Sequence, residues 1–177
     1  MFITNSTTGA TSKTYDSSIT AFDSTWHHVA FTWDAGTLEL YVDGVKDTSV
    51  TKTADNAVTS IRTTTAALTI GNGTNNFYFD GNIDEVAVWN TTLTDAQITA
   101  IYNSGTPNDL RLHSASANLQ GFWKMGDLVT SFPTYPDASG NGNTGTATNM
   151  VVGDIETEAP GSDTPVTESW VIIEEEV

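Results

Sequence analysis

Four side chains carry the oxygen atoms that a calcium ion prefers as ligands. They are Asp80, Asp84, Asp137 and Asn141, and they are the candidate metal ligands of this chain, with calcium as the candidate cofactor. For Asp84, a structural role is favoured over metal binding. In that role its carboxylate accepts backbone N–H bonds and fixes the turn at Gly81 and Asn82.

A sugar-binding site needs an exposed aromatic ring that stacks on a pyranose face, with amide or carboxylate groups beside it. The candidates of this kind are Tyr41, Tyr78, Asn75 and Asn76. Because successive side chains of a strand point to opposite faces, Tyr78 points away from Phe77 and Phe79. We expect Phe77 and Phe79 to lie in the core, so Tyr78 is the better surface candidate.

The charge balance restricts the partners. The 177 residues include 6 basic and 22 acidic side chains, which gives a formal net charge of −16. Such a field repels phosphate backbones and anionic lipid surfaces, so we expect neither nucleic acid nor membrane insertion. The chain has no cysteine, which excludes thiol catalysis and thiolate metal sites.

The most regular pattern lies in residues 26–44 (WHHVAFTWDAGTLELYVDG) and predicts a β-hairpin. In the first alternating run, Val29, Phe31 and Trp33 share one face of their strand. In the second run, Leu38, Leu40 and Val42 share one face of theirs. Asp43 and Gly44 tolerate the positive φ of a following tight turn. His27 and His28 are interpreted as packing and hydrogen-bonding residues, because no third metal ligand is evident.

The next segments predict strands and one helix. Residues 66–70 (AALTI) predict a buried strand, and residues 83–90 (IDEVAVWN) predict a strand covered on both faces. Thr94 and Gln97 form a capping box that begins a short helix near residues 94–104. Further along, residues 119–125 (LQGFWKM) predict a strand, and residues 137–145 predict a turn rich in Gly and Asn.

These segments, in this order, resemble the laminin G-like domains of the concanavalin A-like lectin/glucanase superfamily, close to pentraxins. The resemblance rests on WHHVAFTWDAGTLELYVDG, LTIGN and FDGNIDEVAVWNTTLTDAQITAIYNSG. It implies an all-β fold, an antiparallel jelly-roll-type β-sandwich with one short helix.

Members of this family usually open with a strand like GFWKMGD and a turn like DASGNGNTG, but here both follow the helix. We therefore divide the chain into three parts. Residues 1–112 form a sandwich that lacks its usual first strands. Residues 113–152 resemble the opening of such a domain, and residues 153–177 are an acidic tail. We expect residues 118–150 to supply the missing strands, either within the chain or to a neighbouring copy.

Catalysis is not expected, and the sequence offers no candidate catalytic residue. Glucanases of this superfamily place two carboxylates about 5 Å apart on one strand face. Asp84 and Glu85 are adjacent and face opposite sides, and Gly81 interrupts the strand between Asp80 and Asp84.

The resemblance leaves several binding roles open, because this fold hosts sugar binders, protein binders and adhesion modules. The loop that carries acidic calcium ligands in pentraxins reads NGTNN here and has no carboxylate. The serial arrangement of modules resembles large marine phage structural proteins. We expect a non-enzymatic structural or adhesion module of a virion or extracellular surface, with other copies or structural proteins of the same assembly as partners. The alternatives are a glycan-binding lectin module and a calcium-dependent binding domain.

Overall fold

The alternation in residues 26–44 forms the predicted hairpin. In the computed structural model, β3 (His28–Asp34) pairs antiparallel with β4 (Thr37–Val42), with Phe31 opposite Leu40 and Trp33 opposite Leu38. A second tight turn leads into β5 (Val45–Lys46), which pairs with the end of β4. At Gly44 the φ angle is 72°, and an added Cβ would lie 2.9 Å from the Cβ of Tyr102. Glycine is therefore required there by both conformation and space.

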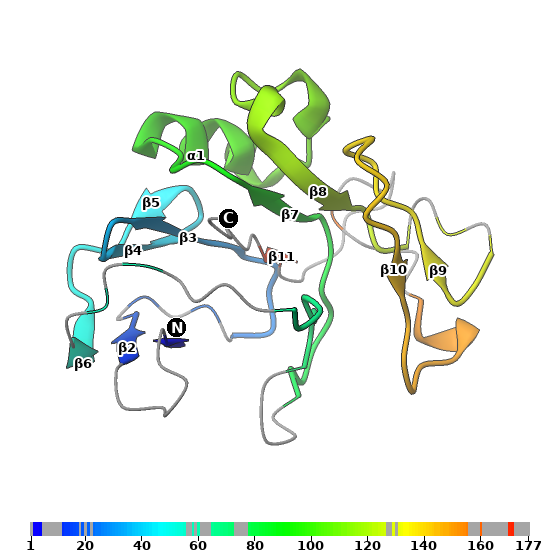
Figure 1. The fold of residues 1–177 in the computed structure, drawn as a ribbon, viewed down its shortest axis with the longest axis horizontal. Helices are drawn as coiled ribbons and strands as arrows, with labels where there is room; N and C mark the ends of the chain where they lie inside the picture. The colour runs from blue at the N-terminus through cyan, green and yellow to red at the C-terminus, as the bar shows by residue number, and fades with distance from the viewer. Residues whose placement is uncertain are drawn as a thin grey trace.

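The structure describes residues 2–4, 12–17, 19, 21, 23–55, 58, 60, 65–72, 78–126, 129, 131–155, 160 and 170–171. Most of its regular elements are strands, arranged in small sheets (Figure 1). Beyond the hairpin they are β1 (Phe2–Thr4), β2 (Ser12–Asp16), β6 (Thr51–Asp55), β7 (Val86–Trp89), β8 (Leu119–Trp123), β9 (Thr134–Tyr135), β10 (Gly145–Thr146) and β11 (Trp170–Val171). Of the described residues, none belongs to a helix long and apolar enough to cross a membrane.

The β3–β4 hairpin separates two apolar clusters. On one face, the side chains of Phe31, Trp33, Leu38 and Leu40 pack with Tyr15 and Val58. On the other face, Ala30 and Tyr41 pack with Trp89 of β7, Phe122 of β8 and Ile98 of the helix. In Figure 1 the helix and the β7–β8 pair accordingly lie over this second face of the hairpin. The hairpin is thus covered on both sides.

The β7–β8 pair joins segments on either side of the helix. All four side chains of β7 are buried, as predicted for a strand covered on both faces. It pairs antiparallel with β8 of the same chain, with Ala87 opposite Phe122 and Val88 opposite Gly121. Ala87, Trp89 and Phe122 enter the cluster beneath the helix, whereas Val86, Val88 and Trp123 form a third cluster on the opposite face. The division of the chain at residues 112 and 152 stays a prediction.

The predicted helix is α1 (Asp95–Tyr102), followed by a 3₁₀ turn at Asn103–Gly105. Thr94 is the N-cap: its hydroxyl accepts from the N–H of Gln97, and the side chain of Gln97 accepts from the N–H of Thr94. This is the predicted capping box. Ile98 and Ile101 are buried against the hairpin and the β7–β8 pair.

The predicted buried strand at residues 66–70 is wrong. The structure places no strand there, and Ala66, Leu68 and Thr69 are exposed, Leu68 to 43%. An apolar run becomes a buried strand only when a neighbouring strand pairs with it. Within the described residues, the β-pairing nearest to this run is a single isolated bridge between Asn72 and Tyr78.

Candidate functional site

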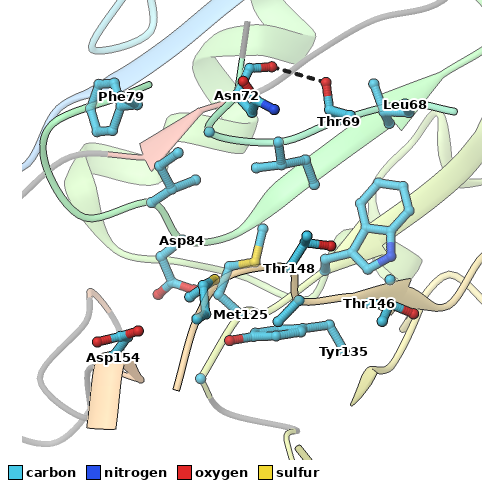
Figure 2. A pocket seen from close by; sticks show the side chains of 18 of the residues that line it. Leu68, Thr69, Asn72, Phe79, Asp84, Met125, Tyr135, Thr146, Thr148 and Asp154 are labelled. Carbon is cyan, nitrogen blue, oxygen red and sulfur yellow. Dashed lines mark hydrogen bonds between the residues drawn. The ribbon is translucent and has the colours of Figure 1, made fainter. Parts of the chain in front are cut away.

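A groove of about 1360 Å³ lies against the face of the β7–β8 pair that points away from the helix (Figure 2). We call it the β8 groove. One wall is formed by residues 67–72, 78–79 and 81–84, and the other by residues 120–121, Trp123, residues 125–126, Tyr135 and residues 143–150, with further lining from Trp26, Val88, Asp154 and Ile155. It brings together segments from before and after the helix.

The floor of the β8 groove is apolar and aromatic. Trp123 lies on it and packs with Val86 and Val88, while Met125 and Tyr135 pack against this cluster and are only partly buried. The indole N–H of Trp123 donates to the carbonyl of Asn143 at 2.7 Å, which fixes the ring. A Cβ added to Gly121 would lie 2.2 Å from the Trp123 ring, so the ring fits only because residue 121 is glycine.

One end of the β8 groove is acidic. In Figure 2 the carboxyl groups of Asp84 and Asp154 and the hydroxyl of Tyr135 lie toward the same end. Burial raises the pKa of Tyr135, and the negative charge of Asp154 raises it further. Among the described residues that line the groove, these two carboxyl groups are the charged ones. The site therefore favours neutral or cationic groups over anionic ones.

Asp84 accepts a backbone N–H, as the sequence favoured, and this bond comes from Glu85. That Asp84 fixes the turn at Gly81 and Asn82 stays a prediction. The side chain of Asp84 is 1% exposed, and one carboxylate oxygen accepts the N–H of Glu85 at 2.9 Å. Glu85 has a φ angle of 51° and is also buried. The carboxylate of Glu85, just before β7, forms an ion pair at 3.3 Å with Lys124, just after β8. Asp84 and Glu85 thus serve different partners.

Asp137 and Asn141, two of the predicted metal ligands, form hydrogen bonds with the backbone of β8, and metal binding by them stays a prediction. The carboxylate of Asp137 accepts the N–H groups of Phe122, Ser139 and Asn143 at 2.8–3.0 Å. The amide of Asn141 donates to the carbonyls of Leu119 and Gln120. We call residues 137–143 the β8 cap, because their side chains satisfy the outer edge of β8.

The electrostatics of Asp137 agree with this role. Burial alone would raise the pKa of Asp137, but the hydroxyl of Ser139 and the backbone N–H groups of Phe122, Asn143 and Ser139 hold it below its ordinary value. The stabilisation that depends on the lowered pKa is present above pH 3.8 and is lost as the pH falls through the pKa of the folded protein.

Replacement of Asp137 with alanine is expected to lower the free energy of unfolding by about 2–3 kcal/mol, because several backbone N–H groups lose their acceptor. Urea unfolding followed by tryptophan fluorescence measures the change. Asp80→Ala is the control: Asp80 is exposed, and its replacement should change stability by less than about 0.5 kcal/mol. Equal effects of the two substitutions would refute the role of the β8 cap.

The other predicted site residues are dispersed. Tyr41 is wrong as a sugar-stacking residue, because its ring is 1% exposed and its hydroxyl lies 2.7 Å from Asp95 and 2.9 Å from Glu39. Tyr78 lines the β8 groove and is 65% exposed, so it stays a candidate. Asn75 and Asn76 lie outside the described residues. Within the described ranges, no three His, Cys, Asp or Glu side chains gather as a metal site would require.

Two adjacent histidines, His27 just before β3 and His28 at its first position, lie in contrasting environments. His27 lies between the carboxylates of Asp43 and Asp23, at 2.8 and 3.0 Å. Burial lowers its pKa, but these two carboxylates outweigh that effect and raise it. His28 is fully buried and stacks on Tyr102, with ring centroids 5.9 Å apart. Burial lowers its pKa to about 4.

Sequence reasoning missed Trp123, Tyr135 and Asp154 as lining residues of one groove. A partial signal was present, because alternation in the segment GFW puts Gly121 and Trp123 on one face. Tyr135 lies in the two-residue strand β9 and Asp154 in a 3₁₀ turn, and the positions of such short elements depend on contacts with distant parts of the chain.

A family model described as the concanavalin A-like lectin/glucanases superfamily matches residues 1–99, more than half of the chain. Searches of curated proteins and of solved structures gave no match. The matched region contains the hairpin and β7, and it ends within α1.

Proposed function

Since the chain belongs to the concanavalin A-like lectin/glucanases superfamily, we propose that it is a non-enzymatic structural or adhesion module of a larger assembly. Its fold is then the antiparallel jelly-roll-type β-sandwich that the superfamily implies. Its partners are other copies or other structural proteins of the assembly, on a virion or an extracellular surface. The likeness to marine phage structural proteins in the order of its segments motivates this location.

The β8 groove is the observation that carries the proposal. Its floor offers Trp123, Met125 and Tyr135, side chains that bind by contact area and do not supply a nucleophile or a general base for hydrolysis. Such a surface suits attachment to another macromolecule.

The carboxylates near the groove also favour binding over glycoside hydrolysis. A retaining hydrolase needs two carboxyl groups about 5 Å apart that both face the substrate. Here the carboxylate of Asp84 accepts a backbone N–H, and that of Glu85 is paired with Lys124. Asp137 is committed to the backbone of β8.

A glycan-binding role is the second candidate, and Tyr78 favours it. This ring is exposed at the β8 groove, and Asn72 lies beside it across a ladder bridge. Stacking on Tyr78 with hydrogen bonds from an amide is a common way to hold a sugar. A calcium-dependent form of such binding is the further alternative.

A glycan array probed with and without EDTA separates these roles. The structural proposal predicts no sugar binding in either condition, together with surface labelling of intact particles or unpermeabilised cells by antibodies against the chain. Sugar binding that EDTA leaves intact would replace the proposal with the lectin role, and binding that EDTA abolishes would replace it with the calcium-dependent role. Absence of surface labelling would contradict the proposed location.

A further inference from the structure

The β8 groove is large for a small-molecule site. Such sites usually enclose about 300–1,000 Å³, whereas this groove holds about 1360 Å³. Residues 67–72, 78–79 and 81–84 line one side of it, and residues 143–150 line the other. A chain-like ligand, rather than a compact metabolite, fits these dimensions.

The side chains on the floor favour a peptide over a glycan. Besides its aromatic rings, the groove presents Ile70, Ile83 and Met125, which are only partly covered. Aliphatic and thioether groups gain most from burying other apolar side chains, and a sugar offers few of these. An extended peptide places alternate side chains against such a floor.

Charge decides which peptide fits. The charged residues among the described lining are Asp84 and Asp154. The negative charge of Asp154 already raises the pKa of the Tyr135 hydroxyl. A basic side chain that reaches this acidic end would meet both a carboxylate and an aromatic ring. A second copy of this chain carries the same net charge of −16, so electrostatics oppose self-association through the groove.

The outer edge of β8 is closed to an added strand. The β8 cap provides hydrogen bonds to Leu119, Gln120 and Phe122, the groups that an incoming strand would use. A partner segment is therefore expected on the face of the β7–β8 pair, where the groove lies, and not along that edge.

From these observations we infer that the β8 groove binds an extended segment of a different protein in which apolar and basic side chains alternate. The inference rests on the proposed role as an assembly module and names the chemistry of its partner.

Fluorescein-labelled peptides of alternating Val-Lys, Val-Glu and Ser-Lys, titrated with the full chain, test the inference by fluorescence anisotropy. The Val-Lys peptide should bind about tenfold or more tightly than the other two, because it alone supplies both apolar contact and positive charge. Equal affinity for Val-Lys and Ser-Lys would show attraction by net charge only and would overturn the inference. Absence of binding to all three would overturn it as well.

A matched pair of variants ties the binding to the groove. Thr148 is exposed and lines the groove, so Thr148→Arg adds a positive charge to the groove without touching the core. It should weaken Val-Lys binding about fivefold or more. Ala96→Arg, on the exposed side of α1, makes the same change in net charge away from the groove and should leave the affinity within about twofold.

The variants and the surface labelling together decide whether the groove binds a foreign peptide, a second copy or neither. Equal effects of Thr148→Arg and Ala96→Arg would overturn the inference. Self-association in sedimentation experiments that Thr148→Arg abolishes would assign the groove to a second copy and also overturn it. If the chain binds no peptide but antibodies against it still label intact particles or cells, this inference fails and the proposed function stands.

Discussion

Replacement of Phe122 with alanine is expected to lower the free energy of unfolding by about 3–5 kcal/mol. The ring of Phe122 is 1% exposed and packs in the cluster that contains Trp89, Ile98 and Tyr41. Its loss would leave a cavity between β8, the hairpin and the helix. Guanidinium unfolding followed by circular dichroism measures the effect.

Leu112→Ala provides the matched control for this experiment. Leu112 lies in the connector that precedes β8 and is 84% exposed, so truncation of its apolar side chain should change stability by less than about 0.5 kcal/mol. If Phe122→Ala were as mild as Leu112→Ala, β8 could not be part of the core of its own chain.

Acidification from pH 6.5 to about 4 is expected to remove about 3 kcal/mol of stability through His28. Above pH 6.5 the ring is neutral in both states and the term is zero. Below pH 6.5 His28 binds a proton in the unfolded chain. In the folded protein the same ring stays neutral down to about pH 4, because it is buried against Tyr102. Urea unfolding at a series of pH values measures this loss.

Neighbouring His27 supplies the control, because its pKa is shifted in the opposite direction. Its pKa is raised, so its stabilisation is present below pH 6.5 and is lost as the pH rises through the pKa of the folded protein. His28→Leu should therefore remove the loss between pH 6.5 and 4, whereas His27→Gln should keep it. If His28→Leu fails to fold, NMR titration of the wild-type ring decides, and a midpoint near 6.5 would refute the prediction.

Local patterns predicted the local structure well. Alternation in residues 26–44 gave the hairpin and the shared face of Phe31 and Leu40, because both depend on strand period and turn chemistry alone. The capping box at Thr94 gave the start of α1 for the same reason. These features need no knowledge of distant contacts.

The features that sequence reasoning missed depend on distant partners. Residues 66–70 have the composition of a buried strand, but burial required a partner strand that the described structure does not place beside them. Tyr41 shares a face with Ala30, and only the packing of α1 and β7 over that face makes it buried. The carboxylate of Asp137 has the chemistry of a calcium ligand, and its use by Phe122 could not be predicted without the position of β8.

The central claim is that β8 completes the fold by pairing with β7 of its own chain, and a double cysteine variant tests it most directly. Asn90 and Asn118 lie side by side at the end of this pair, with a side-chain hydrogen bond of 3.1 Å, and the natural chain has no cysteine. Oxidised Asn90→Cys/Asn118→Cys should run as a monomer on a non-reducing gel, with a mass two hydrogen atoms below that of the reduced chain. A disulfide-linked dimer that reduction dissolves would show that β8 pairs with another copy and would contradict the account.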